Sequence, residues 1–505
     1  MVPRPAPRST PPPLIPEFYA GRELFITGAT GFMGKVLVER LLWTCQEISK
    51  LHLLMRPKKD VSPEKRLKQL KQSQVFDVIR ERCPKQLEKL SIVAGDITQP
   101  KLGLNKDTIQ RLRKVSVVFH SAAIVKFDEM LDVAVEQNLK SVLKVMDFCD
   151  QLPMIQVMVY ISTAYSNADI PNIEECVYTT QMNPHQLMSI VDNLSKEALT
   201  AVTPSLISPK PNTYTFTKAM AESAVAERAL AAKYATAIFR PSIVVSSLQN
   251  PFPGWIENLN GPSGITVSAG KGLLHVIHCS GNKRADMIPV DIAIDTLIAV
   301  AWETGIDKCR ETRVYNCCSY DNPTTWGEFK VGMLHNVRKY PFDTPLWYPF
   351  GFFTENKFVL TVAQWLLQVV PLHSIDFLCN MFGIKTSLNL ATISKRLRTM
   401  SKSLQFFMTN EWKFNTDNVR RLRERLTPAD SAILNLDVSA IDWNDHCEKF
   451  IQGTRRYLLK EKDEDIERAH SRMRLLHILH RLVQFVIALF LCWLVLHLPT
   501  RLTVF

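Results

Sequence analysis

Short runs rich in valine and isoleucine alternate with longer helical patterns between Gly21 and about Val245. This alternation predicts repeated strand-helix-strand units, which form a parallel sheet. Because the strands are nearly continuous apolar runs, helices should cover both faces of the sheet, and a ligand should bind where the strands end. The six expected strands cover residues 23–27, 51–56, 91–97, 115–123, 157–163 and 236–242. We therefore expect an α/β protein built on a doubly wound parallel sheet.

A glycine-rich turn, TGATGFMG, follows the first expected strand and precedes a helical pattern. Gly28 and Gly31 would permit a tight turn and a close approach of the backbone to an anion, and Gly34 would let the helix pack against the sheet. The N-terminus of this helix would then present its N–H groups to a pyrophosphate. The turn predicts a Rossmann-like dinucleotide site whose binding residues are Gly28, Thr30, Gly31, Phe32 and Gly34.

The end of the second expected strand bears on the choice of cofactor. In this fold an acidic residue there would bind the ribose of NAD, but the strand ends in Arg56, with Lys58 and Lys59 close behind. Cationic side chains at this place favour the 2′-phosphate of NADPH. These residues also open a basic insertion, so ordinary surface charges are the alternative. The adenine and ribose of the cofactor are expected at further strand ends, beside Asp96, Ile97 and Ala122.

A tyrosine and a lysine four residues apart are the candidate catalytic residues. Among eleven tyrosines only Tyr214 has a lysine, Lys218, at this spacing, which places both on one face of a helix capped by Asn212 or Thr213. The ammonium group should lower the pKa of the phenol, which could then donate a proton to an oxygen that gains negative charge. Taken alone, the pair could be an accidental surface contact, but it follows the glycine turn in the expected order.

Hydroxyl side chains follow the fifth expected strand in the motif YISTAYSN. Ser162 or Thr163 should point into the cleft at the end of this strand and donate a hydrogen bond to the same substrate oxygen as the tyrosine. The alternative is that these hydroxyl groups bond only to the local backbone, as strand hydroxyl groups often do.

The net charge of +12 favours anionic partners, either phosphorylated small molecules or acidic lipid headgroups. Nucleic acid is the weakest candidate, because no run of basic residues is interleaved with aromatic ones, and we expect no nucleic-acid partner. The eleven cysteines include no CxxC pair, and no zinc-finger signature occurs. We therefore expect reduced thiols that face the cytosol and no bound metal.

Composition divides the chain into consecutive parts. Residues 1–20 are rich in proline and are expected to form a disordered leader. Residues 21–345 are expected to form the NADP-binding domain with a substrate-binding portion. Residues 350–460 show no strand alternation and are expected to form a mostly helical domain.

An uncharged run over residues 482–498 predicts a membrane anchor, since its length is at the low end of what a spanning helix needs. Arg472, Arg474 and Arg481 precede it, and this charge bias would keep the preceding chain in the cytosol. Gln484 and His497 make a buried or interfacial helix the alternative.

Six motifs occur in order along the chain: TGATGFMG, HSAAIVKFDE, YISTAYSN, YTFTK, FRPSIV and PFPGWIENLNGPSG. Together they resemble the alcohol-forming fatty acyl-CoA reductases, a membrane-associated branch of the extended short-chain dehydrogenase/reductase superfamily. The helical stretch from NEWKFNTDNVRRL to IDWNDHCEKFIQGTRRYLL looks like the C-terminal domain of this family. The resemblance therefore covers nearly the whole chain.

The resemblance implies NADPH-dependent reduction of a long-chain fatty acyl-CoA to a primary alcohol, by way of an aldehyde and with release of CoA. It implies that Tyr214 is the general acid and that Lys218 is its activator and a ribose ligand. Thr163 best matches the catalytic hydroxyl of the superfamily, with Ser162 as the runner-up. Asn138 matches a helix asparagine of related enzymes and is placed with the cofactor-binding residues.

Two other functions remain open at this point. A membrane-bound NAD(P)-dependent sterol dehydrogenase would share the glycine turn and the catalytic residues, and a tethered protein that binds NADPH without catalysis would share the turn. The family resemblance suggests a peroxisomal or endoplasmic-reticulum membrane, although the last residues, TVF, are no peroxisomal address of the SKL type. Chain-length preference is undetermined, and a homo-oligomer is allowed.

Overall fold

The computed structural model describes residues 13–57, 61–381 and 390–497. Contacts group these residues into two compact units. The first unit holds the described chain up to Ile256, with the segments Arg284–Thr325 and Asn410–His446. The second unit holds Glu257–Lys283, Trp326–Thr409 and the described chain from Cys447. Segments that are far apart in the sequence therefore build each unit together.

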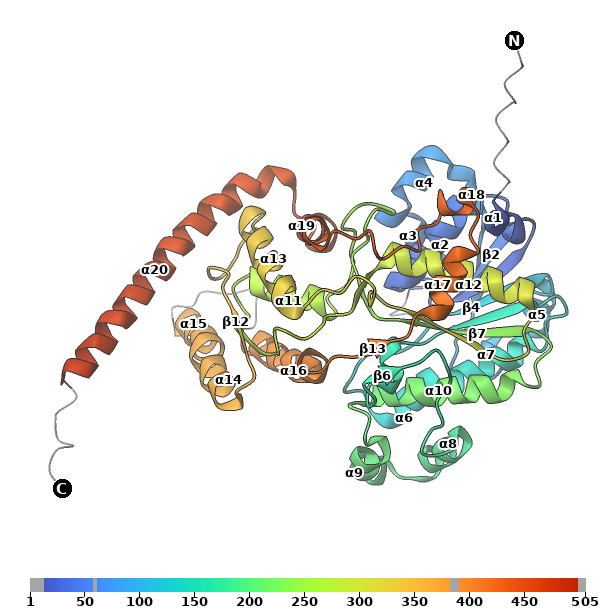
Figure 1. The fold of residues 1–505 in the computed structure, drawn as a ribbon, viewed down its shortest axis with the longest axis horizontal. Coiled ribbons are helices and arrows are strands. Elements are labelled where there is room, and N and C mark those ends of the chain that lie inside the picture. Colours follow the sequence, from blue (N-terminus) through green and yellow to red (C-terminus); the bar gives the residue numbers. More distant parts are fainter. Residues whose placement is uncertain (1–12, 58–60, 382–389, 498–505) are drawn as a thin grey trace, which may run out of the picture. The chain divides into compact units, whose positions relative to one another are not determined.

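A seven-stranded parallel sheet lies at the centre of the first unit (Figure 1). Its strands are β1 (Glu23–Thr27), β2 (Lys50–Met55), β3 (Leu90–Ala94), β4 (Val115–His120), β5 (Val157–Ile161), β7 (Ala235–Pro241) and β11 (Arg313–Cys317). They are ordered β11-β7-β5-β4-β1-β2-β3, and neighbouring strands are parallel. The order reverses between β1 and β4, so a ligand should bind beside the carboxyl ends of these strands. The predicted α/β class with a doubly wound sheet is confirmed.

The seventh strand, β11, is absent from the sequence prediction because Arg313 and Asn316 interrupt its apolar pattern. In the sheet it pairs with β7, and Asn316 is fully buried. The Asn316 amide donates hydrogen bonds to the carbonyl oxygens of Ile173 and Asn415 at 3.3 and 2.8 Å. The side-chain nitrogen of Asn316 is thus satisfied by distant backbone groups, whereas its buried side-chain oxygen has no hydrogen-bond partner among the described residues.

Helices cover both faces of the sheet (Figure 1). On one face α2 (Phe32–Thr44) packs against α12 (Val290–Asp307), and on the other α7 (Ser141–Cys149) packs against α10 (Thr213–Ala229). Apolar side chains of β1, β4 and β5 join those of α7 and α10 in one continuous core. Other helices of this unit are α3 (Pro63–Lys71), α4 (Asp77–Arg82), α5 (Lys106–Arg111), α6 (Leu131–Ala134), α8 (Pro184–Asn193), α9 (Lys196–Ile207), α17 (Asp417–Glu424) and α18 (Pro428–Ser431). Two short parallel strand pairs are β6 (Asn172–Ile173) with β13 (Lys413–Phe414) and β8 (Ile243–Val245) with β10 (Met287–Pro289).

The N-terminal segment is partly folded. Leu14–Tyr19 form α1, which ends in a fully buried Tyr19. The Tyr19 hydroxyl donates a hydrogen bond to the carbonyl oxygen of Ile298 in α12 at 2.8 Å. The prediction of a disordered leader over residues 1–20 is therefore wrong for α1. Apolar side chains of this helix are buried against the rest of the first unit. Residues 1–12 lie outside the described chain.

The second unit is mostly helical, but its bounds differ from the predicted domain of residues 350–460, because it includes Glu257–Lys283 and begins again at Trp326, and Asn410–His446 belongs to the first unit. Its helices are α11 (Pro262–Gly270), α13 (Trp326–Lys339), α14 (Lys357–Gln364), α15 (Val370–Met381), α16 (Leu390–Thr409), α19 (Trp443–Gly453) and α20 (Ile466–His497). The first residues of α19 belong to the first unit. A π-helical turn, η6 (Trp365–Val369), joins α14 to α15. Two short strands, β9 (Val276–His278) and β12 (Phe352–Thr354), pair in parallel.

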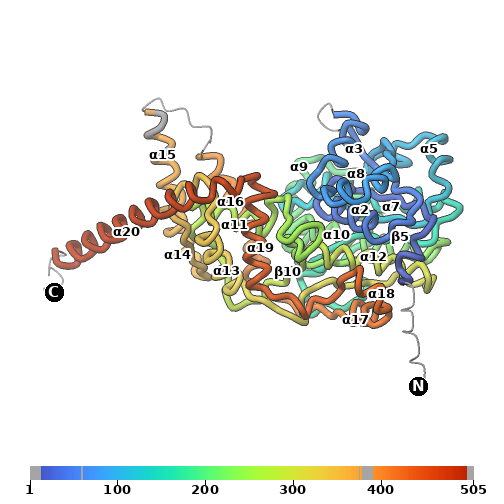
Figure 2. Tube along the Cα trace, turned by 90° about the horizontal axis from the view of Figure 1, so that it is seen from above, coloured from blue at the N-terminus to red at the C-terminus, as the bar shows by residue number. Residues whose placement is uncertain are grey.

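Helix α20 is long and apolar enough to cross a membrane (Figure 2). Near its start, Arg468 and Arg472 form ion pairs with Asp343 at 2.9 and 3.3 Å. Helix α20 begins at Ile466, so the predicted run over residues 482–498 forms its C-terminal half. Leu498 lies outside the described chain. The prediction of an apolar C-terminal helix is confirmed.

Substitution of Gly34 tests the packing of α2 on the glycine turn. A Cβ atom at Gly34 would overlap the carbonyl oxygen of Gly28, whereas at Gly31 it would lie 3.2 Å from the same oxygen. We expect Gly34→Ala to lower the free energy of unfolding by about 1–3 kcal/mol, and Gly31→Ala, the control, to cost less than about 1 kcal/mol. Thermal unfolding in detergent measures the difference. Equal melting temperatures for the two variants would contradict close packing at Gly34.

Candidate active site

The glycine turn lies between β1 and α2, at the point where the strand order reverses. Gly28 has a φ of +76°, and a Cβ atom there would lie 2.7 Å from the backbone nitrogen of Ala122, which follows β4. Gly31 occupies the N-cap position of α2 and supplies no side-chain hydrogen bond to the first N–H groups of the helix. The turn therefore brings bare backbone and a helix N-terminus together, which is the arrangement that binds a pyrophosphate.

A hydrogen-bonded histidine joins the glycine turn to the next strand. The Thr27 hydroxyl lies 2.8 Å from Nδ1 of His120 and accepts a hydrogen bond from the N–H of Ala122 at 3.2 Å. Burial, and secondarily the charge of Lys218, lowers the pKa of His120 to about 3. The imidazole is therefore neutral, and its ring stacks on Tyr160 of β5 with centroids 5.8 Å apart. His120 was not predicted as a site residue, although it lies within the predicted strand of residues 115–123, two residues before the predicted Ala122.

Two arginines lie together at the adenosine end of the predicted site. Arg66, in α3, donates a hydrogen bond to the Thr30 hydroxyl at 2.9 Å and another to the carbonyl oxygen of Arg56 at 2.5 Å. Burial, followed by the positive charge of Arg56, lowers the pKa of Arg66. Arg56 itself lies 3.6 Å from Asp96. Arg66 was not predicted, since it lies among many other basic residues of the insertion. The predicted Lys58 and Lys59 lie outside the described residues.

Of the remaining predicted cofactor residues, Asp96 and Ile97 follow β3, and Asn138 lies in the π-helical segment η4 (Val135–Lys140). The Asp96 carboxylate accepts hydrogen bonds from the N–H and hydroxyl of Thr98, both at 2.9 Å, and Ile97 is buried beside it. Asn138 is buried, and its amide binds the backbone N–H and carbonyl of Ile124 at 2.9 and 3.1 Å. Asn138 thus holds the loop that follows β4.

Tyr214 and Lys218 lie on the first turns of α10, which Asn212 caps by accepting a hydrogen bond from the N–H of Thr215. The Lys218 ammonium donates to the carbonyl oxygen of Ile161 at 2.7 Å and lies 4.7 Å from the centre of the Tyr160 ring. Since Tyr160 stacks on the histidine that bonds to Thr27, a continuous series of contacts connects the lysine to the glycine turn.

The Tyr214 ring is held from two sides. It stacks on Phe127, with centroids 5.8 Å apart, and its hydroxyl forms a hydrogen bond with Thr163. The Thr213 hydroxyl donates to the carbonyl oxygen of Glu129 at 2.9 Å, which fixes the Phe127 loop against α10. Phe127 was not predicted, although it lies in the motif HSAAIVKFDE.

The expected lowering of the tyrosine pKa is wrong. Burial raises the pKa of Tyr214 to about 12, opposed by the hydrogen bond from Thr163. Burial also lowers the pKa of Lys218 to about 7, and the nearby Glu222 charge opposes that shift. Desolvation is the largest cause of both pKa shifts, and Tyr214 is a neutral phenol at neutral pH.

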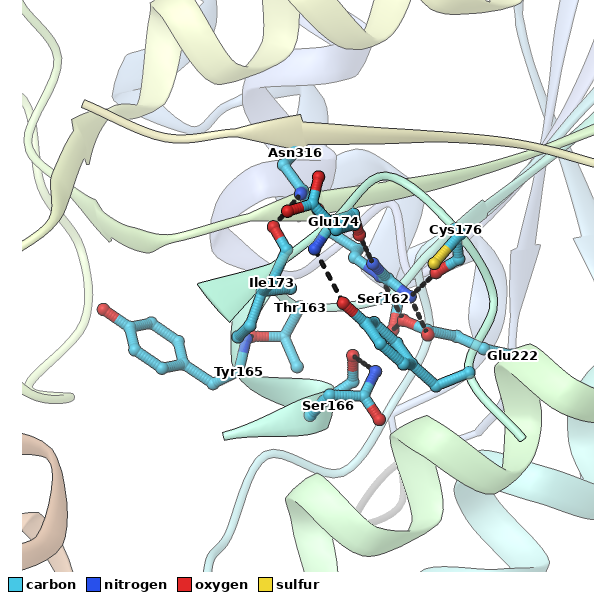
Figure 3. A network of polar contacts seen from close by, with 12 residues as sticks. Ser162, Thr163, Tyr165, Ser166, Ile173, Glu174, Cys176, Glu222 and Asn316 are labelled. Carbon is cyan, nitrogen blue, oxygen red and sulfur yellow. Dashed lines mark hydrogen bonds and ion pairs between the residues drawn. The ribbon is translucent and has the colours of Figure 1, made fainter. Parts of the chain in front are cut away.

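The two predicted hydroxyl residues have different partners, and Figure 3 shows Ser162 in the polar network around Glu222. The Ser162 hydroxyl donates to the Glu222 carboxylate at 2.5 Å, whereas Thr163 contacts Tyr214. Glu222 is also paired with Arg240 through two hydrogen bonds of 2.9 and 2.6 Å, and both members of this pair are almost completely buried. Ser162 is thus part of a buried polar network, and Thr163 is the hydroxyl that faces the tyrosine.

The PFPGW motif packs on the glycine turn. Trp255 is fully buried, and its ring stacks on Phe32 at the start of α2, with centroids 5.3 Å apart. The Asp291 carboxylate accepts hydrogen bonds of 2.8–2.9 Å from the N–H groups of three consecutive residues, Leu248 to Asn250, which lead into the motif. A buried carboxylate therefore fixes the loop that carries Trp255.

The Rossmann-type sheet, the glycine turn and the tyrosine and lysine pair define a nicotinamide-dependent oxidoreductase. Two family models described as male sterility protein match the chain, an NAD-binding model over residues 26–297 and a second model over residues 367–461. Fatty acyl-CoA reductase 1 of Rattus norvegicus is 35% identical over 91% of this chain and 89% of its own length. Fatty acyl-CoA reductase 2 of Bos taurus is 35% identical over 95% of this chain and 92% of its own length. The chain belongs to the fatty acyl-CoA reductase family.

Solved structures share the fold at low sequence identity. The terminal R domain from the myxalamid PKS-NRPS biosynthetic pathway has a TM-score of 0.57 and 16% identity, covering 86% of this chain and 91% of that one. The reductase (R) domain of a nonribosomal peptide synthetase from Mycobacterium tuberculosis has a TM-score of 0.56 and 17% identity, covering 88% and 93%. These likenesses support the Rossmann-like architecture.

Substitution of Glu222 tests the buried network. In Glu222→Gln the charge of Arg240 would stay buried without its counter-ion, and we expect the free energy of unfolding to fall by about 3–5 kcal/mol. Ser162→Ala is the matched control, since it removes one neutral donor at a cost of about 1 kcal/mol. Thermal unfolding in detergent compares the two variants. A Glu222→Gln protein as stable as Ser162→Ala would show that the ion pair is not needed.

Proposed function

We propose that this protein is an alcohol-forming fatty acyl-CoA reductase that uses NADPH to reduce long-chain acyl-CoA to a primary alcohol through an aldehyde, with release of CoA. The observation that carries the proposal is the series of contacts that connects Tyr214, Thr163 and Lys218 to the glycine turn, in a chain of this family. A reductase needs a proton donor, an oxyanion partner and a dinucleotide site close together.

The residues around the turn fit a nicotinamide dinucleotide. The close approach of Gly28 to Ala122 leaves no room for a side chain, and Gly31 begins a helix whose N–H groups suit a pyrophosphate. The residues proposed to hold the cofactor are Gly28, Thr30, Gly31, Phe32, Gly34, Arg56, Asp96, Ile97, Ala122, Asn138 and Lys218, to which we add Arg66. When bound, the cofactor supplies one hydride for each of two reductions.

The side chains of the site then complete each reduction. Thr163 and Tyr214 donate hydrogen bonds to the substrate oxygen as it gains negative charge. In the first reduction the thioester carbon gains a hydride, the carbon–sulfur bond of the adduct breaks, and CoA leaves as a thiolate that takes up a proton from solvent, which releases the aldehyde. In the second reduction the aldehyde gains a hydride, and Tyr214 gives the oxygen its proton. The Tyr214 phenol is protonated at neutral pH, as a proton donor must be.

The pair of arginines at the end of β2 supports NADPH over NADH. Arg66 and Arg56 are close enough for one positive charge to lower the pKa of the other, and an anionic group between them would relieve this repulsion. A ribose phosphate is such a group, whereas a ribose hydroxyl is not.

Helix α20 is proposed to anchor the enzyme in a peroxisomal or endoplasmic-reticulum membrane, with the catalytic residues in the cytosol. Arg472, Arg474 and Arg481 stand on the N-terminal side of the apolar segment, as the positive-inside rule requires. Gln484 bonds to His480 at 3.0 Å, so this polar side chain is satisfied within the helix. A membrane anchor suits a substrate whose acyl chain partitions into lipid.

Loss of the phenol tests the proposed chemistry. We expect Tyr214→Phe to lower kcat with palmitoyl-CoA and NADPH by about 10²–10⁴-fold, since the general acid is removed. Tyr234→Phe is the control, because that hydroxyl bonds to the backbone of α7, to the carbonyl oxygen of Met146. Product analysis follows aldehyde and alcohol, with two NADPH expected per alcohol. Full activity of Tyr214→Phe would refute the assigned role, and NADPH binding without turnover of any acyl-CoA would favour a non-catalytic binding protein.

The cofactor preference depends on Arg66. We expect Arg66→Ala to raise the KM for NADPH about 10-fold or more and to change the KM for NADH little, because a charged hydrogen bond to phosphate contributes about 1.5–3 kcal/mol. Arg113→Ala, an exposed arginine that precedes β4, serves as the control. Steady-state kinetics with both cofactors measures the ratio. An equal rise of both KM values would place Arg66 away from the ribose phosphate.

A further inference from the structure

Helices α14 and α15, with the turn η6 between them, expose one continuous apolar face. Its side chains are between 40% and 76% exposed, with Phe358 and Phe377 the most exposed. We call this set the apolar face; it consists of Phe358, Val359, Val362, Trp365, Leu366, Val370, Phe377 and Met381. Soluble proteins rarely expose an apolar surface of this extent without a partner.

The opposite side of the same helices is packed and partly polar. Gln368 is buried, and its side-chain oxygen accepts a hydrogen bond from the N–H of His275 at 3.0 Å. Leu372 is buried in a cluster with Leu390 and Leu397 of α16. The polarity of the segment is thus inverted relative to a surface helix of a soluble protein, with a glutamine inside and phenylalanine and tryptophan outside.

The charges around the apolar face are distributed as a lipid surface requires. Between Phe358 and Met381 the sequence contains one aspartate, Asp376, and no glutamate, lysine or arginine. The neighbouring helix α16, which packs against α15, contains no acidic residue and exposes Lys395, Arg396, Arg398 and Lys402. An apolar face beside a basic helix is the pattern of segments that lie on anionic membranes.

We propose that α14 and α15 lie in the plane of a bilayer as a second membrane contact, with the apolar face in the boundary between headgroups and acyl chains and the basic side of α16 against anionic headgroups. The same unit carries α20, and in both views α14 and α15 lie on the side of the unit towards which α20 runs (Figures 1 and 2). Gln368 and Leu372 are buried on the side of the segment that packs against the rest of the unit. Because that side remains packed on protein, the segment cannot span the bilayer. This contact is independent of the proposed reductase activity.

Quenching of tryptophan fluorescence by brominated lipids tests the contact in the full-length protein. The protein is placed in phosphatidylcholine and phosphatidylserine vesicles, with bromine either near the headgroup end or near the methyl end of the acyl chains. In Trp365→Phe we expect bromine near the headgroup end (shallow) to quench less tryptophan fluorescence than in the unchanged protein. Quenching by bromine near the methyl end (deep) should stay the same. The matched control Trp412→Phe, a buried tryptophan of the first unit, should leave both signals unchanged. Equal signals from the two variants would overturn the proposal.

Neutralising the basic side of α16 tests the headgroup contact. We expect the combined change Lys395→Gln, Arg396→Gln and Arg398→Gln to abolish the increase in shallow quenching that phosphatidylserine causes in the unchanged protein. The control, Lys65→Gln, Lys68→Gln and Lys71→Gln, removes the same charge from α3 in the first unit. A phosphatidylserine effect that survives the α16 change would contradict this part of the proposal. A dimer that Trp365→Ser dissociates, together with absent shallow quenching, would assign the apolar face to a second copy of the chain and overturn it.

Discussion

The buried ion pair between Arg240 and Glu222 is the constraint on which the site depends. Two charges can remain in the interior only if every donor and acceptor around them is satisfied. Here Arg240, on β7, bonds to the carboxylate on α10 and to two carbonyl oxygens of the loop after β6, while Ser162 donates to the same carboxylate. The pair therefore fixes α10 against β7, and the Ser162 hydrogen bond holds the same helix against the end of β5. The contact between Thr163 and Tyr214 is a consequence of that fixed position.

Burial also determines the protonation of the site. The same low-dielectric interior raises the pKa of Tyr214, lowers that of Lys218 and lowers that of His120. Each of the three groups is pushed towards its neutral form, because the neutral form needs less solvation. A site arranged in this way favours a neutral proton donor over a preformed phenolate, which suits a reaction that places negative charge on the substrate.

Much of the fold and part of the site could be predicted because they depend on local patterns. The six predicted strands are mostly apolar runs, the turn at Gly28 needs a residue without a side chain, and Asn212 caps α10 as expected. The strand β11 and helix α1 were missed, since polar residues or prolines mask their patterns and distant segments stabilise them. Arg66 and His120 were missed because no local pattern distinguishes them from other charged or strand residues.

The sequence by itself determined the parallel sheet, the dinucleotide turn, the spacing of Tyr214 and Lys218, and the apolar C-terminal helix. These features follow from periodicity, glycine positions and helix geometry, which act over a few residues. Only the tertiary structure decided which hydroxyl faces the tyrosine, which charges meet in the interior and in which direction the pKa values move. Those outcomes depend on burial and on contacts between residues such as Ser162 and Glu222, which are 60 positions apart in the chain.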